Sequence, residues 1–191
     1  MTNETDKLEN ARRQGQAQFD SIREMVAALE CDYDRLEELR DARESLVWDV
    51  ENAESDEEKE QAHVSFSAWE SENDEDLKLL ESEAGDCKDA EEARERIEQD
   101  ALSVDVRSDW HTPGDEDSKP SQFRILLCTG GPAVQIRGEL NDYMEPSRAW
   151  LEVQDWFVPW EEMYLGEGSQ DILLAYARCF YFGERTLCKA L

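Results

Sequence analysis

Residues 19–36, FDSIREMVAALECDYDRL, carry the pattern that decides the predicted fold. Their apolar side chains recur at alternating intervals of three and four residues, which is typical of a helix that packs along a narrow stripe, as in a coiled coil. The stripe consists of Phe19, Ile22, Val26, Leu29, Tyr33 and Leu36. Beyond Leu36 a strict heptad would place two arginines in the core, so we expect the stripe to shift and its packing partner to change there. The shifted stripe consists of Leu39, Leu46, Val50 and Ala53.

The sequence around this stripe predicts a helical hairpin. No Gly or Pro interrupts residues 19–53, so we expect one helix of about 50 Å, and Gly15 is expected to fray or bend its start. Residues 55–58, SDEE, match the capping-box pattern and predict a turn near Glu54 followed by a second helix that ends at Gly85. A short connection between long helices favours an antiparallel pair.

Two further features complete the predicted hairpin region. The apolar face of the second helix consists of Ala62, Phe66, Trp69, Leu77 and Leu80. Asp86 is expected to cap a third helix that runs to about Ala101.

The period of the apolar residues changes after Leu102 from that of a helix to that of a strand. We expect strands at residues 104–106, 123–129, 133–140 and 149–154, with a loop at 111–122, a hairpin turn at 130–132 and an apolar helix at 171–182. The predicted fold class is α+β: a long antiparallel, coiled-coil-like helical hairpin in residues 1–102 and a small antiparallel sheet with one covering helix in residues 103–191.

The charge of the chain is its most unusual property. It has 48 acidic and 20 basic residues, a formal charge of -28, of which residues 1–102 contribute -21 and the remainder -7. Such a field repels nucleic acids and anionic membranes and attracts cationic protein surfaces. We therefore expect no direct nucleic-acid or membrane partner, and a basic protein as the partner.

The sequence shows no apolar stretch of about 18 residues and no signal-peptide core. Its five cysteines have no close pairing, which indicates reduced, structural thiols, so a cytoplasmic protein is expected. The cysteines are Cys31, Cys87, Cys128, Cys179 and Cys188.

Patterns that indicate enzyme chemistry are weak. His63 and His111 have no triad or metal-ligand spacing around them, and the cysteines lack the spacing of a zinc site. The acidic runs at 74–76 and 115–117 lack the ligand order of a calcium loop, and Gly130-Gly131-Pro132 lacks the helix and Lys of a phosphate loop. The aromatic run at 156–160 is more typical of a core than of a binding patch. We expect a non-enzymatic protein without metal or cofactor.

The acidic side chains of the predicted hairpin recur three or four residues apart, which costs a few tenths of a kcal/mol per pair in an isolated helix. That cost becomes useful if the helices imitate duplex DNA, which carries one charge per about 1.7 Å of axis. The candidate partner-binding residues are Asp49, Glu51, Glu54, Asp56, Glu57, Glu58, Glu60, Glu70, Glu72, Asp74, Glu75 and Asp76. A structural coiled-coil scaffold and an acidic chaperone for basic proteins are the alternatives. The apolar stripe would close within one chain or between two, so a homodimer stays open.

Residues 123–140, FRILLCTGGPAVQIRGEL, together with 146–152, PSRAWLE, and Asp155-Trp156 resemble small uncharacterised proteins of bacterial plasmids, integrative elements and phages. The resemblance covers most of the second half and implies a mobile-element accessory protein, for which antagonism of host defence is a common role. By charge and size the chain is also similar in kind to DNA-mimic anti-restriction and anti-CRISPR inhibitors. The resulting hypothesis is an inhibitor that occupies the basic DNA-binding channel of a CRISPR effector or restriction enzyme.

Overall fold

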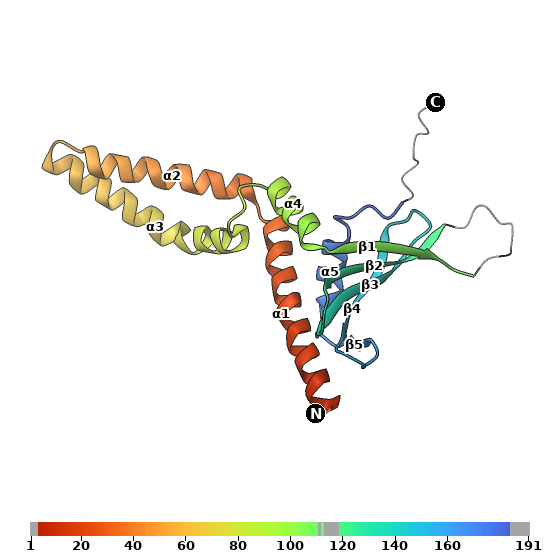
Figure 1. The fold of residues 1–191 in the computed structure, drawn as a ribbon. Helices are drawn as coiled ribbons and strands as arrows, with labels where there is room; N and C mark the ends of the chain where they lie inside the picture. Colours follow the sequence, from red (N-terminus) through yellow and green to blue (C-terminus); the bar gives the residue numbers. More distant parts are fainter. Residues whose placement is uncertain (1–3, 111, 113–118, 184–191) are drawn as a thin grey trace. The chain divides into compact units, whose positions relative to one another are not determined.

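The computed structural model describes residues 4–110, 112 and 119–183, with only the backbone of residues 4–7. The fold is α+β, as predicted (Figure 1). In chain order the elements are α1 (Glu4–Glu30), α2 (Tyr33–Asn52), α3 (Asp56–Ala84), α4 (Ala90–Asp100), β1 (Ser103–Ser108), β2 (Pro120–Cys128), β3 (Ala133–Leu140), β4 (Pro146–Gln154), β5 (Glu161–Met163) and α5 (Ser169–Ala177).

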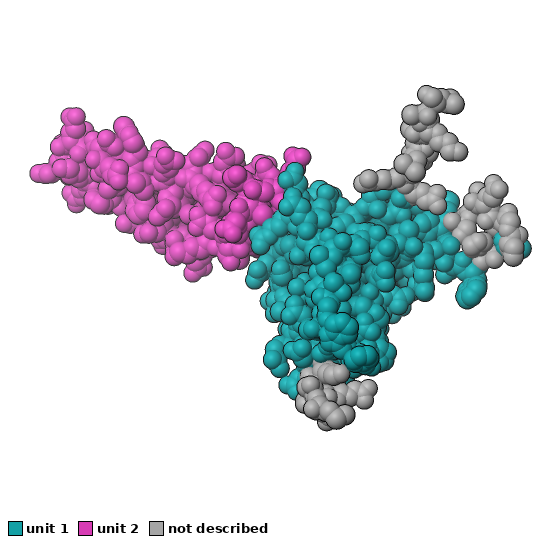
Figure 2. Space-filling model, viewed as in Figure 1, with its two compact units in different colours: residues 1–26, 94–191 teal, residues 27–93 magenta. Residues whose placement is uncertain are grey.

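The chain forms two compact units (Figure 2). Unit 1 comprises residues 1–26 and 94–191, and unit 2 comprises residues 27–93. These bounds differ from the predicted domains 1–102 and 103–191, because the first part of α1 and most of α4 belong with the sheet. The helix pattern of residues 19–36 shows where a stripe lies, but it does not show whether a helix or a sheet covers it.

The sheet of unit 1 is an antiparallel meander in the order β1-β2-β3-β4-β5. Ile125 pairs with Ile136, which pairs with Leu151, and all three are fully buried on one face. Successive side chains of a strand point to opposite faces, so the neighbouring pairs Arg124–Arg137 and Arg137–Trp150 lie on the other face. The sheet therefore has one apolar face and one face rich in polar and charged groups.

Most of the predicted strands are confirmed, with different ends. The hairpin across Gly130-Gly131-Pro132 is present, and β5 was not predicted. Strand β4 begins at Pro146 instead of residue 149, and β2 begins at Pro120, inside the predicted loop. Residues 111 and 113–118 of that loop lie outside the described residues.

Helices α1 and α5 pack on the apolar face of the sheet. At Gly15 a Cβ atom would lie 2.5 Å from Val153 Cγ1 and 2.8 Å from Met163 Sδ, so α1 approaches β4 and β5 through the missing side chain. The predicted fraying or bend at Gly15 is therefore wrong: α1 continues through it, because close packing replaces the lost helix propensity. Fully buried Ile22 and Ala11 extend the same contact stripe along α1.

Helix α5 is shorter than the predicted helix 171–182. It ends at Ala177 because the backbone N–H groups of Cys179 and Phe180 bond to carbonyl groups three residues earlier, a turn that does not continue the α-helix. The chain then places Phe182 against Phe123 of β2, with 4.6 Å between the ring centroids. The apolar sheet face is thus covered by α1, α5 and this turn.

The single helix predicted for residues 19–53 is wrong. Helix α1 ends at Glu30, and Asp32 begins α2 by accepting a 3.0 Å hydrogen bond from the Arg35 backbone N–H group. An Asp N-cap can start a new helix without Gly or Pro, since its carboxylate satisfies a backbone donor that would otherwise lack a partner. The packing partner consequently changes at Asp32, before Leu36.

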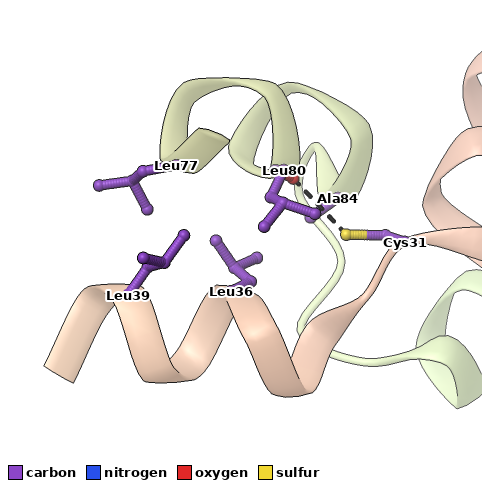
Figure 3. Close-up of a cluster of buried hydrophobic side chains, with 6 residues drawn as sticks. All are labelled: Cys31, Leu36, Leu39, Leu77, Leu80 and Ala84. Atoms are coloured by element: carbon purple, nitrogen blue, oxygen red, sulfur yellow. Dashed lines mark hydrogen bonds between the residues drawn. The ribbon is translucent and has the colours of Figure 1, made fainter. Parts of the chain in front are cut away.

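Unit 2 contains the predicted hairpin, with α2 and α3 running antiparallel (Figure 1). Ser55 and Glu58 form the predicted capping box, and Gly85 ends α3 with a positive φ of 55°. The two helices are joined along a buried seam (Figure 3). The seam consists of Cys31, Leu36, Leu39, Leu77, Leu80 and Ala84. Towards the turn at residues 53–55, the predicted seam residues Leu46, Val50, Ala62 and Phe66 are only half-buried.

The predicted cap of the third helix is misplaced by three residues. The backbone N–H group of Glu92 donates to Asp89 Oδ1 at 2.8 Å, and the Glu92 carboxylate accepts from the backbone of Lys88 at 2.9 Å. Asp89 therefore caps α4 in place of Asp86, because only Asp89 lies three residues before a backbone donor of the first turn.

Candidate protein-binding site on the acidic hairpin

Most of the negative charge of the chain belongs to unit 2. Residues 27–93 contain 25 acidic and 6 basic side chains, a net charge of -19 out of the total of -28. Because the apolar seam occupies the facing sides of α2 and α3, the carboxylates lie on their outer surfaces. The hairpin is thus a frame of two helices that carries fixed negative charge.

Seven of the candidate residues lie together at the turn that joins α2 and α3. They are Asp49 and Glu51 in the last turns of α2, Glu54 in the connection, and Asp56, Glu57, Glu58 and Glu60 at the start of α3. All seven are exposed. We call this group the tip cluster.

The other five candidates form a second group on α3. Glu70 is ten residues beyond Glu60, which corresponds to about 15 Å along a helix. This group consists of Glu70, Glu72, Asp74, Glu75 and Asp76, of which Asp74 is half-buried and the others are exposed. The structure therefore does not bring the twelve predicted residues into one site.

Glu58 has a structural role in the tip cluster. Its carboxylate accepts hydrogen bonds from the backbone N–H groups of Ser55 at 3.0 Å and Glu54 at 3.1 Å. These two bonds favour the charged form and lower the pKa of Glu58. A carboxylate held in this way is less available to a partner, so the other six residues carry the accessible charge of the cluster.

Two carboxylates of the second group are compensated by neighbouring cations. Lys78 Nζ lies 2.5 Å from Asp74 Oδ2, and Arg35 Nε on α2 lies 3.4 Å from Asp76 Oδ2. For the other residues of both groups, Glu58 apart, no cation lies within 4.0 Å in the part of the chain that the structure describes. They are Asp49, Glu51, Glu54, Asp56, Glu57, Glu60, Glu70, Glu72 and Glu75.

Trp48 is the feature of this site that sequence reasoning missed. Its side chain is 62% exposed beside Asp49, and both residues line a hollow of about 520 Å³ between the ends of α2 and α3, together with Asn52 and Gln61. The sequence contained a signal for this exposure. Trp48 follows the stripe residue Leu46 by two positions, and residues two apart on a helix do not share a face, so Trp48 cannot face the seam. Exposed tryptophans are enriched where proteins bind other proteins.

Other candidate chemical groups do not gather into a site. His63 is exposed on α3, while His111, Asp115–Asp117 and Cys188 lie outside the described residues. Cys31, Cys87 and Cys179 are buried free thiols, and burial raises the pKa of Cys31 and Cys179. Within the described ranges, no three His, Cys, Asp or Glu side chains are placed to hold a metal ion.

Two further observations concern surfaces. Over residues 4–110 and 119–183, no helix is both long enough and apolar enough to span a bilayer. In the aromatic run predicted as core, Val158 is buried, whereas Trp156 is 60% and Phe157 94% exposed, so that prediction is wrong for these two rings. Phe157 has a positive φ of 66° in the connection between β4 and β5.

Comparison of the chain with protein-family models, with curated proteins and with solved structures finds no match.

Proposed function

We propose that the α2–α3 hairpin is a DNA-mimic surface, with which this protein occupies the basic DNA-binding groove of a host defence nuclease complex, either a CRISPR effector or a restriction enzyme. The observation that carries the proposal is the set of nine exposed carboxylates with no cation within 4.0 Å among the described residues, held on two packed helices. They have no chemical role beyond standing in for phosphates.

The linear density of the hairpin's charge is within about a factor of two of that of duplex DNA. Helix α3 has 29 residues, which corresponds to a length of about 43 Å. Residues 33–84 hold 19 acidic and 5 basic side chains, and their net charge of -14 over that length gives one charge per about 3.1 Å, against about 1.7 Å in duplex DNA. A groove lined with Lys and Arg would therefore meet a similar electrostatic surface, and counterion release would favour binding.

The order of the hairpin supports mimicry over a loose acidic tail. The buried seam fixes α2 against α3 near Leu36 and Leu77, and the capping box fixes the start of α3. A preorganised array loses less conformational entropy on binding than a disordered acidic segment. Trp48 at the same end provides an apolar contact that a partner protein can recognise, which charge alone does not offer.

The packing of the seam disfavours the scaffold alternative. Leu36, Leu39 and Leu77 are each at most 4% exposed and are covered within one chain. A scaffold that associates through this stripe would need it uncovered. An acidic chaperone has the same overall charge but does not require a fixed geometry, so the position of the carboxylates separates these two functions.

The proposal is tested by displacement of fluorescently labelled duplex DNA from purified restriction enzymes and CRISPR effector complexes. The full chain is expected to displace the duplex from at least one complex, and the displacement should weaken steeply between about 50 and 200 mM salt. Retention of the duplex by every complex at the lower salt concentration would exclude the function.

A further inference from the structure

The polar face of the sheet in unit 1, opposite α1 and α5, contains a hollow of about 360 Å³. Its lining includes Arg107 from β1, Gln122 and Arg124 from β2, Gln135 and Arg137 from β3, and Trp160 between β4 and β5. This volume is at the lower end of the range found for small-molecule sites, about 300 to 1,000 Å³. The volume of the hollow therefore fits a small molecule and is too small for a polymer.

Gln135 provides an unfilled hydrogen-bonding position at this hollow. Its side chain is 3% exposed, and its amide Nε2 donates to Glu152 Oε2 at 2.6 Å. The amide orientation is fixed, because the reverse one would place two oxygen acceptors together. Gln135 Oε1 is buried and has no hydrogen-bond partner among the described residues. A buried acceptor without a donor is costly, so this position favours a ligand that brings an N–H or O–H group.

The charge of the hollow is opposite to that of the chain. Three arginines and one carboxylate, Asp105, line it. Arg124 is held by Asp105 Oδ2 at 2.9 Å, while Arg107 Nε and Arg137 Nη2 both donate to Gln122 Oε1, at 2.9 and 3.2 Å. Arg137 also pairs with Glu152, with 3.4 Å between Nη1 and Oε1, so Arg107 is the guanidinium of the hollow that has no carboxylate within 4.0 Å among the described residues. Arginines with unused N–H donors can bind a phosphate or carboxylate group of a ligand.

Two tryptophan side chains lie in and beside the hollow, near these arginines. Trp160 is half-buried in the wall of the hollow. Beside the hollow, Trp150 donates to Glu152 Oε1 at 2.9 Å, and the guanidinium groups of Arg137 and Arg148 lie 5.7 and 5.3 Å from the centroid of its ring. Hydrogen bonding and cation–π contacts hold this wall rigid. The exposed part of Trp160 is available to stack on a planar ring.

We propose that this hollow is a binding site for a mononucleotide. The base would stack on Trp160 and donate an N–H group to Gln135 Oε1, and the phosphate would bind Arg107 and Arg124. A mononucleotide combines the planar ring, the donor and the anionic group that these residues accept. The site lies entirely in unit 1 and does not depend on the proposed role of the hairpin.

Isothermal titration of the full chain with the four nucleoside 5′-monophosphates tests the proposal, with the matching nucleosides and inorganic phosphate as reference ligands. At least one monophosphate is expected to bind one-to-one with a dissociation constant below about 1 mM, and at least 10-fold more tightly than its nucleoside or inorganic phosphate. Arg107→Gln and Arg124→Gln should each weaken binding about 10-fold. Arg96→Gln removes the same charge from an exposed position of α4 in unit 1, outside the hollow, and should leave the affinity within about 2-fold.

A second measurement follows the amide of Gln135 by NMR. Its side-chain resonance should shift on addition of the monophosphate, whereas that of exposed Gln170 on α5 should not. Absence of saturable binding by all four monophosphates would overturn the site. Equal binding of inorganic phosphate, or equal losses in Arg96→Gln and Arg124→Gln, would show only a nonspecific attraction of anions and would also overturn the proposal.

Discussion

Ser55 and Glu58 exchange hydrogen bonds at the start of α3: the Ser55 backbone N–H group donates to Glu58 Oε2 at 3.0 Å, and the Glu58 N–H group donates to Ser55 Oγ at 3.2 Å. This reciprocal pair fixes the turn that carries the tip cluster. It also assigns one of the cluster's carboxylates to the stability of the hairpin instead of to its partner.

Loss of the cap should destabilise unit 2. Ser55→Ala removes the acceptor of the Glu58 N–H group and is expected to lower the free energy of unfolding by about 1 kcal/mol. Ser67→Ala, at an exposed position within α3, serves as the control and should be neutral or slightly stabilising, because Ala is the better helix former. Urea unfolding followed by circular dichroism measures both. Equal effects of the two substitutions would show that the cap contributes nothing.

The capping bond of Glu58 predicts a pH dependence of definite sign. Because the pKa of Glu58 is lowered in the folded chain, its contribution to stability is present above the unfolded pKa, about 4.3, and is lost as the pH falls through the folded value. NMR titration should show the pKa of Glu58 below the unfolded value of about 4.3. Glu58→Gln should reduce the acid sensitivity of α3, and an unchanged acid transition would contradict this account.

The buried seam should contribute most of the stability of the hairpin. Leu77 is 4% exposed and Leu79, two residues further along α3, is 58% exposed. Leu77→Ala is expected to lower the free energy of unfolding by about 2 to 5 kcal/mol, whereas Leu79→Ala should change it by less than about 0.5 kcal/mol. Amide hydrogen exchange within residues 33–84 measures the difference. Similar protection in the two variants would rule out a seam closed within the chain.

The close approach of α1 to the sheet predicts the outcome of substituting Gly15. Gly15→Val would force its side chain into Val153 and Met163, and it is expected to destabilise unit 1 by about 1 to 3 kcal/mol in spite of a better helix propensity. The exposed neighbour Gln16→Ala is the control and should have little effect. Thermal unfolding compares them. A stabilised Gly15→Val variant would show that α1 does not pack on β4.

The parts of the fold that were predicted correctly depend on neighbours in the sequence. The capping box at residues 55–58 and the hairpin turn at 130–132 each signal their structure within a few residues. The break at Asp32 was missed because only Gly and Pro were considered as helix breakers, although an Asp N-cap is sufficient. The assignment of residues 1–26 to the sheet was missed because an apolar stripe does not identify its partner.

The sequence predicts the negative charge of the candidate site, but it predicts only some of the ion pairs that neutralise part of this charge. Lys78 lies four residues after Asp74, a pair that the sequence alone indicates. The contact of Arg35 with Asp76 spans 41 residues and depends on the register of α2 against α3, which composition does not determine. The hollow beside Gln135 likewise requires the register of three strands.

The central claim is that the position of the carboxylates matters as well as their number. Two variants of equal charge test it in the displacement of labelled duplex DNA from a nuclease complex. The first reverses Asp49, Glu51, Asp56 and Glu57 to Lys. The second reverses Glu24, Glu95, Asp142 and Glu167, exposed residues of unit 1. Each raises the net charge from -28 to -20, because every reversal adds two charges.

The tip variant should lose displacement by about 10-fold or more at about 50 mM salt, and the control variant should stay within about 2-fold of the unmodified chain. Circular dichroism should show the same helix content in both. Equal losses in the two variants, or full activity of the tip variant, would contradict the claim that the hairpin imitates DNA.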